Sequence, residues 1–391
     1  MENDLCLSAV DAVLRAESSF CKFLSANDSG ETGGHQSGIL ISMTAAETCF
    51  SKEEIWNNHI MKRQINIIWQ NDFSTESVLT WYESKKEIRI TRFGRGFPFR
   101  GPEYTGALFV LTRADQDNYR GFIFNTEEEI NEFLDTFGLT PAETNCPVRL
   151  SQSFSENREQ KVIEQYIRSL DVDFPTSEEM SAAARRIFQQ ISTESCSPVQ
   201  NPDKILLDWT NEEYSLFQAI EQERYGKEIT DGFSSMESFV SLANKVLNRR
   251  KSRAGKSLEH HLSCIFDENQ IQYSAQAITE KKKKPDFIFP SVEAYHDMTF
   301  SIDKICTLAA KTTCKDRWRQ ILNEADRLKD DTKYLCTLQQ SISGNQMDEM
   351  QSEKVVLVVP EPYIRTYPAD HRDRIWTLKH FVEYIRELEA S

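Results

Sequence analysis

Three polar residues in the last third of the chain have the types and the spacing of a centre that cleaves phosphodiesters. Asp286 opens the apolar run PDFIFP, Lys311 lies near the end of the run KICTLAAKTT, and Glu324 follows in DRWRQILNEADRLKD. Carboxylate oxygens are the ligands that Mg²⁺ prefers, so Asp286 and Glu324 are candidate ligands for this cation. The ammonium group of Lys311 would orient the attacking water and offset negative charge in the transition state.

A plainer interpretation stays open, because acids and lysines are common near strand ends in α/β proteins. Lys311, however, stands among small and apolar residues, where an unpaired ammonium group would be costly to bury. This setting favours a functional partner for the lysine.

The segment directly after Lys311 is rich in cations. Lys315, Asp316 and Arg317 open a run that we expect to be a helix. Cations in a first turn oppose the helix dipole, and a bound phosphate or base edge would remove the conflict. Lysine and arginine donate to guanine O6 and N7 and aspartate accepts from cytosine N4, so the triplet suits adjacent G·C pairs. A solvated, charged first turn is the alternative.

Apolar patterns divide the chain into regions that would position these groups. Residues 1–175 are rich in short strand patterns, and Thr126 is expected to cap a helix there. Residues 176–204 carry Ser, Thr and Pro around a short helical pattern, which predicts a linker with a hinge near residues 191–204.

Residues 205–391 form the predicted second domain. Three helical patterns, NEEYSLFQAIEQER, MESFVSLANKVLNRR and KSLEHHLSCIFDENQ, come first. From Lys284 onward strands and helices alternate, with DRWRQILNEADRLKD among the helices, and this predicts an α/β layer with a mixed sheet.

The composition is that of a globular protein of about two domains. The chain has 391 residues, and 46 Lys and Arg against 61 Asp and Glu give a net charge of −15. This acidic mean argues only weakly against DNA binding, because it says nothing of local patches. The sequence contains no membrane span or signal peptide, so we expect a cytoplasmic protein. The nine scattered cysteines are expected to be reduced.

Several longer runs resemble the EcoRII-type restriction endonucleases of the PD-(D/E)xK nuclease superfamily. They are RAGKSLEHHL, KPDFIFP, LAAKTTCKDRWRQILNEADR and VVLVVPEPYI, together with RITRFGRGFPFRGPEYTGALFVL in the N-terminal half. The resemblance implies an α+β protein with a β-rich, DNA-binding pseudobarrel followed by an endonuclease-like α/β domain with a central mixed sheet.

The resemblance also assigns the site residues. The family's metal-binding aspartate falls on Asp286, its catalytic lysine on Lys311 and its helix-borne glutamate on Glu324. The acid that usually stands two residues before the lysine is absent, as in the EcoRII-related branch. Tyr295 falls on an active-site tyrosine, and Glu259 matches a further acid near such metal sites, although a surface glutamate is nearly as good an interpretation.

DNA recognition is assigned in the same way. Lys315, Asp316 and Arg317 match a triplet that reads outer C·G pairs, which implies a 5′-CCWGG-like target. In the N-terminal half, four arginines along EIRITRFGRGFPFR are expected to bind a second, effector copy of the site, or else to protect an exposed edge strand. They are Arg89, Arg92, Arg95 and Arg100.

Three other features have weaker interpretations. An acid-free basic stretch between Lys245 and Lys256, with Arg249, Arg250, Lys251 and Arg253, is expected to follow a DNA backbone. The four lysines 281–284 suit a solvated loop. His260 and His261 point about 100° apart on a helix, so they suit packing or the surface better than one metal ion.

These features together imply a type IIE endonuclease. The resemblance implies a homodimer that uses Mg²⁺ and leaves 5′-phosphate ends. The nuclease is expected to be restrained until the protein binds a second copy of the site. The expected partner is double-stranded DNA; a DNA cytosine methyltransferase is a functional rather than a physical partner, and no membrane partner is expected. The alternatives are a noncatalytic DNA-binding regulator and a repair or junction nuclease. Retention of the three catalytic groups argues against a noncatalytic regulator. A sequence-reading triplet together with a second DNA-binding domain argues against a repair or junction nuclease.

Overall fold

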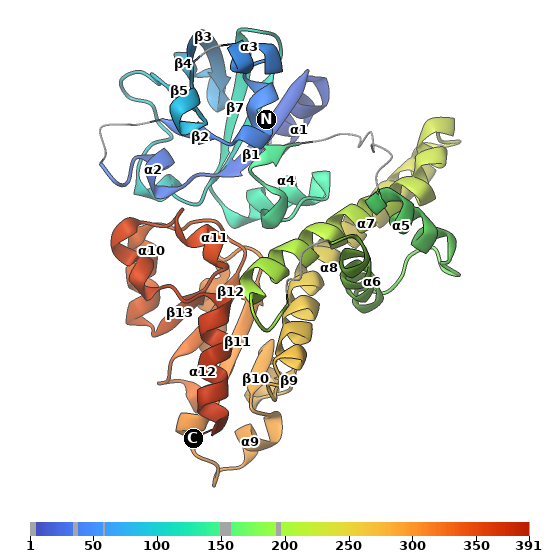
Figure 1. Ribbon diagram of the computed structural model, residues 1–391, viewed down its shortest axis with the longest axis vertical. Coiled ribbons are helices and arrows are strands. Elements are labelled where there is room, and N and C mark those ends of the chain that lie inside the picture. Colours follow the sequence, from blue (N-terminus) through green and yellow to red (C-terminus); the bar gives the residue numbers. More distant parts are fainter. Residues whose placement is uncertain (1–4, 34–37, 58, 149–157, 193–196, 391) are drawn as a thin grey trace.

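The computed structural model describes residues 5–33, 38–57, 59–148, 158–192 and 197–390 of the chain. In Figure 1 a β-rich N-terminal part lies above a C-terminal sheet, and the helices α5 to α8 lie beside both. The predicted hinge falls partly on residues 193–196, outside the described ranges. Within those ranges, no helix is long and apolar enough to cross a membrane.

An eight-stranded sheet forms the N-terminal part. Its strand order is β2-β5-β4-β3-β7-β6-β1-β8, and all pairs are antiparallel except β3 with β7. The strands are β1 (Ser18–Phe23), β2 (Ile39–Ile41), β3 (Ile60–Trp69), β4 (Ser74–Tyr82), β5 (Glu87–Thr91), β6 (Leu108–Arg113), β7 (Asn118–Phe124) and β8 (Cys146–Pro147). The short helices α2 (Ala26–Ser29) and α3 (Lys52–Asn57) lie between strands.

The two faces of this sheet have separate cores. One core surrounds Trp69, whose ring packs against Phe97 and Phe109. The other lies under α1 (Leu5–Arg15) and α4 (Glu127–Phe137). Thr126 caps α4 as predicted, because its hydroxyl accepts from the Glu129 amide at 3.3 Å.

Four helices, α5 (Arg158–Arg168), α6 (Ser177–Ile191), α7 (Pro202–Asp231) and α8 (Met236–Glu268), follow the N-terminal part. The second and third of the predicted helices are one continuous helix, α8. Helix α6, predicted within a linker, packs on α7 through buried Met180, Ile187 and Leu216. The domain limits of the sequence analysis stay a prediction.

The C-terminal part is built on a five-stranded mixed sheet of order β13-β12-β11-β10-β9. Strands β11 to β13 are parallel, and β10 runs antiparallel to both of its neighbours. The strands are β9 (Ser274–Ala275), β10 (Phe287–Phe289), β11 (Cys306–Lys311), β12 (Lys333–Thr337) and β13 (Val355–Val358). The helices are α9 (Val292–His296), α10 (Gly344–Ser352), α11 (Glu361–Ile364) and α12 (Leu378–Ala390). The predicted fold class, α+β with a β-rich part and a mixed-sheet α/β part, is confirmed.

One predicted α-helix is absent from this sheet's connections. The run after Asp316 forms two short 3₁₀ helices, Arg317–Asn323 and Asp326–Leu328, and Glu324 stands between them. The amide of Asp326 donates to the Glu280 carboxylate at 3.2 Å and that of Arg327 donates to the Tyr295 hydroxyl at 3.1 Å. These donors are taken by tertiary partners, so a regular helical ladder cannot continue through them.

Buried polar contacts join the two halves away from the site. Gln339 donates from its side-chain Nε2 to the Gly106 carbonyl at 3.2 Å, and Gln340 donates from its Nε2 to the Pro141 carbonyl at 2.7 Å. The Glu31 carboxylate accepts from the Gly344 amide, also at 2.7 Å. The halves are therefore docked through specific hydrogen bonds.

Candidate catalytic and DNA-recognition site

Asp286 and Lys311 are neighbours at one edge of the mixed sheet. Asp286 directly precedes β10, and Lys311 ends β11, its antiparallel neighbour. The Asp286 carboxylate oxygen Oδ2 accepts from the Ala310 amide at 2.8 Å and from Lys311 Nζ at 2.9 Å. Asp286 is only 6% exposed, whereas the Lys311 side chain is 25% exposed, so the ion pair is partly buried with the lysine toward solvent.

Glu324 reaches the same place from the 3₁₀ segment. Burial raises the pKa of its carboxyl to about 7; the charge of Lys311 opposes this shift and that of Asp286 adds to it. Its carbonyl accepts from the Thr279 hydroxyl at 2.7 Å, which fixes the backbone here. Glu324 is therefore near enough to Lys311 and Asp286 for their charges to act on its carboxyl group.

The protonation of Lys311 follows from this cluster. Burial by itself would lower the pKa of the ammonium group, but the charge of Asp286 and the hydrogen bond to it raise the pKa above the ordinary lysine value. Lys311 therefore stays charged at neutral pH.

Glu259 and one residue that the sequence analysis missed complete the cluster. Glu259, on α8, accepts from Gln276 Nε2 at 2.9 Å, and the same nitrogen donates to Asp286 Oδ1 at 2.8 Å. Lys256 Nζ lies 3.0 Å from Glu259 Oε2. Gln276 belongs to no motif. Its role depends on contacts with Glu259 and Asp286, which precede and follow it in the chain and become its neighbours only in the folded structure.

Tyr295 lies beside this cluster with a different set of partners. Its side chain is buried, and its hydroxyl donates to Glu280 at 2.6 Å and accepts from the Arg327 amide. Burial and the bond to Glu280 raise the pKa of the phenol. These contacts anchor the segment that carries Glu324, so the described contacts of Tyr295 support positioning rather than contact with the reacting atoms.

The triplet after Lys311 is held by the N-terminal half. The Glu127 carboxylate, 2% exposed at the start of α4, accepts from the backbone amides of Asp316 at 2.8 Å and Arg317 at 2.9 Å. The Asp316 carboxylate in turn accepts from the Glu127 amide at 2.9 Å. Lys315 is buried and donates to Asn125, and burial lowers its pKa to about 8.

A cleft of about 520 Å³ runs beside the triplet between the two halves of the molecule. One wall consists of polar side chains of α4, and the other contains cations of the C-terminal part. The lining residues are Glu128, Asn131, Glu132, Asp135, Lys251, Gly255, Thr312 and Arg317. An acidic helix thus faces the basic side of the candidate DNA site.

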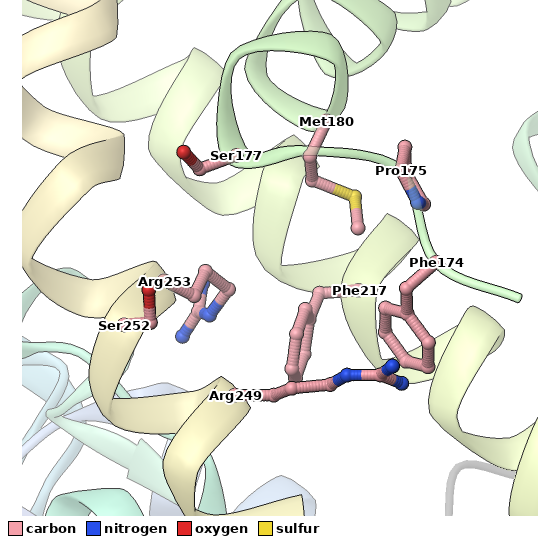
Figure 2. Close-up of a pocket in the computed structure, with 8 residues that line it drawn as sticks. All are labelled: Phe174, Pro175, Ser177, Met180, Phe217, Arg249, Ser252 and Arg253. Carbon is pink, nitrogen blue, oxygen red and sulfur yellow. The ribbon is translucent and has the colours of Figure 1, made fainter.

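The basic stretch of α8 is largely engaged within the protein. Arg250 pairs with Glu221 at 2.7 Å, and buried Arg253 donates to the Gly138 carbonyl at 3.0 Å. Figure 2 shows Arg249 directed toward Phe174; the guanidinium lies 4.0 Å from that ring's centroid. Arg253 is therefore too buried in this arrangement to follow a DNA backbone, while for the rest of the stretch that role stays a prediction.

The N-terminal arginines divide into two groups. Arg92, Arg95 and Arg100 line one hollow of about 480 Å³ together with Phe93 and Phe97. Arg89 instead pairs with Glu87 at 2.9 Å on the sheet. A role for the four in binding effector DNA stays a prediction.

The histidines on α8 have protein partners. His261 is fully buried, with Nε2 3.0 Å from the Glu213 carboxylate. Across the described ranges, no three His, Cys, Asp or Glu side chains lie close enough together to hold a metal ion. A cation at Asp286 and Glu324 would thus need further ligands such as water, substrate oxygens or an amide.

Comparisons with known proteins show the family to which this chain is related. The family model described as restriction endonuclease EcoRII, N-terminal, matches residues 14–134, and that described as EcoRII C terminal matches residues 217–382. The type II restriction enzyme EcoRII of Escherichia coli is 36% identical over 395 residues, which cover 95% of either chain. This chain belongs to the EcoRII family. The predicted family and enzyme class, a type II restriction endonuclease, are confirmed.

Other similarities to this EcoRII-family chain are weaker. The type II restriction enzyme SsoII of Shigella sonnei is 26% identical over 150 residues, 36% of this chain and 48% of that enzyme. A structure of metal-depleted Ecl18kI with uncleaved, modified DNA covers 61% of this chain and 85% of its own at 19% identity, with a TM-score of 0.46. The PspGI–substrate DNA complex covers 60% and 93% at 18% identity, with a TM-score of 0.41.

Proposed function

We propose that this EcoRII-family chain is a Mg²⁺-dependent endonuclease that cuts double-stranded DNA at a 5′-CCWGG-like site. The observation that carries the proposal is the cluster of Asp286, Lys311 and Glu324 directly beside the triplet Lys315–Arg317. A phosphate held at the cluster would lie next to side chains able to read G·C base edges. The enzyme would act in the cytoplasm, where a cognate cytosine methyltransferase protects the host's own sites.

Asp286 and Glu324 are the residues that would hold the cation. The donor set fits Mg²⁺, because both groups are carboxylates and Mg²⁺ prefers oxygen ligands and keeps several waters. When bound, the cation supplies Lewis-acid stabilisation of charge on the phosphate. Burial raises the pKa of Glu324 to about 7, and a cation bound at this carboxyl group would favour its charged form.

Lys311 contributes a fixed positive charge. Because Asp286 keeps it protonated, it acts as a hydrogen-bond donor to the attacking water or to a phosphate oxygen rather than as a base. Its charge offsets the negative charge that grows on the phosphate in the transition state. In-line attack at phosphorus would leave a 5′-phosphate on one product.

We also propose that the N-terminal half restrains the nuclease until it binds effector DNA. The Glu127 carboxylate accepts hydrogen bonds from the backbone amides of the triplet, and the acidic side of α4 lines the cleft beside it. DNA would have to bind at this same place. Effector DNA at Arg92, Arg95 and Arg100 would favour the undocked arrangement, provided that it binds this arrangement more tightly.

A homodimer is part of the same proposal. Each chain supplies one candidate catalytic cluster, whereas a two-fold site has two strands to cut. The joined ends of α7 and α8 project from the rest of the molecule in Figure 1. Met236, Phe239 and Val240 lie there on one face of α8 with 71%, 46% and 49% exposure, which suits a second copy of the chain.

Digestion of plasmids tests the proposed function. Plasmids with zero, one or several CCWGG sites are incubated with Mg²⁺ or with EDTA. Discrete fragments from multi-site plasmids alone, and only with Mg²⁺, support the proposal. Binding without cutting supports a noncatalytic regulator, and cutting that depends on DNA structure rather than sequence supports a repair nuclease; either result contradicts the proposal.

A further inference from the structure

Gln276 lies between two carboxylates of the candidate catalytic centre. Its Nε2 donates to Asp286 Oδ1 at 2.8 Å and to Glu259 Oε2 at 2.9 Å. Its backbone is fixed too, because its amide donates to the Asp286 carbonyl at 3.0 Å and its φ is +51°. The amide group therefore sits on a rigid support at the point where Glu259 and Asp286 converge.

The carboxylates of Glu259 and Asp286 are close enough to accept from the same nitrogen, so their negative charges repel each other, and burial strengthens the repulsion. A donor or a positive charge between them offsets this repulsion. The Gln276 amide supplies two N–H donors and no charge, so it satisfies both acids without neutralising them. A divalent cation would bind the same oxygens and also neutralise their charge.

The acids of the centre do not by themselves form a metal cage. No group of three His, Cys, Asp or Glu within the described ranges is close enough to hold an ion. A side-chain amide also carries an oxygen, which is a good ligand for hard cations. A half-turn about the last side-chain bond exchanges the nitrogen and the oxygen, and rotation about such a bond is easy.

We propose that Gln276 positions the metal centre by switching its amide. In this structure Nε2 holds Glu259 and Asp286 together, and a cation held by these carboxylates would be met by Oε1 once the amide group has turned. The inference rests on the proposed metal-dependent function. It adds Gln276 as a positioning residue and assigns Glu259 to the same cation environment.

Mn²⁺ binding to the full-length, DNA-free protein tests this role. Electron paramagnetic resonance counts free Mn²⁺, and thermal unfolding in EDTA reports the metal-free state. Gln276→Leu keeps the side chain's size but loses both polar atoms, whereas Gln276→Glu keeps an oxygen and loses the donor. Gln351→Glu, at an exposed position on α10, is the charge-matched control.

The two variants have opposite expected effects on Mn²⁺ affinity. Gln276→Leu should weaken binding by about 10-fold or more, as for other residues that orient metal ligands. Gln276→Glu should bind Mn²⁺ more tightly than the wild type, yet unfold at a lower temperature in EDTA because three carboxylates then meet. Gln351→Glu should change neither quantity. If Gln276→Leu does not fold, Gln276→Glu decides the question.

Results that contradict the role of Gln276 can be distinguished from failure of the proposed endonuclease function. Unchanged Mn²⁺ affinity in both variants, or weaker binding by Gln276→Glu, would show that Oε1 never faces the cation and would overturn the inference. If the wild type still cuts multi-site plasmids, the endonuclease proposal survives that result. A wild-type protein that binds no Mn²⁺ contradicts both the metal centre and the inference.

Discussion

Two lysines four residues apart differ in charge state because their surroundings differ. Lys311 pairs with Asp286, and its pKa is raised, so it keeps its proton. Lys315 is buried against Asn125 and the Glu103 carbonyl, neither of which carries charge at the contacting atom, and its pKa falls to about 8. The first is suited to catalysis, while the second is constrained by the docked N-terminal half.

The lowered pKa of Lys315 predicts a pH dependence of stability. The unfolded chain keeps the ordinary lysine pKa, so burial of this ammonium costs stability below pH 8, and the cost falls as the pH rises from there toward the ordinary value. Relative to Lys315→Met, the wild type should gain about 2 kcal/mol between about pH 7.5 and about pH 9.5. Urea unfolding of both proteins at the two pH values measures this difference. A constant difference would contradict the burial of a charged Lys315.

The sequence predicted those helices and strands whose formation depends on local patterns. The apolar runs around Asp286 and Lys311 form neighbouring strands, and Thr126 caps α4, as expected. The run around Glu324 has helical spacing but forms 3₁₀ turns, because Glu280 and Tyr295 take its backbone donors. Such contacts join residues 46 and 32 positions apart and leave no periodic signal.

The contact between α4 and the triplet Lys315–Arg317 predicts how a change at Glu127 affects cutting. Glu127→Gln keeps the size of the side chain but removes the charge that faces Arg317, with Nε 3.4 Å from the carboxylate. The loss of a buried, charge-assisted contact should loosen α4, so cutting of single-site plasmids should rise by about 10-fold. Exposed Glu76→Gln is the control and should leave single-site cutting low. Equal single-site rates for Glu127→Gln and the wild type would rule out restraint through this residue.

The whole molecule combines an acidic average with locally basic faces. Its net charge of −15 discourages nonspecific binding to DNA, while the hollow of Arg92, Arg95 and Arg100 and the cleft wall with Lys251 and Arg317 provide local attraction. Two separate basic faces fit a protein that binds two DNA sites. Because α4 opposes the cleft wall, the proposed function predicts that DNA binds first at the hollow of Arg92, Arg95 and Arg100.

The exposed face of α8 gives a prediction for assembly. Phe239→Asp would place a charge among Met236 and Val240, and a desolvated, unpaired charge in an apolar contact is costly. The proposed dimer should therefore dissociate at least about 10-fold more readily. Sedimentation equilibrium measures this, with Leu14→Asp, at a 59% exposed site on α1, as the control. An unchanged dimer constant in Phe239→Asp would place the interface elsewhere.

The most direct test of the account compares cutting with binding in Lys311→Ala. On a DNA fragment with two CCWGG sites, loss of the half-buried ammonium group of Lys311 should slow cleavage by at least about 100-fold. Binding measured by gel shift without Mg²⁺ should stay close to that of the wild type, and exposed Lys329→Ala should cut normally. If Lys311→Ala cuts this fragment at the wild-type rate, the catalytic centre at Asp286, Lys311 and Glu324 is wrong.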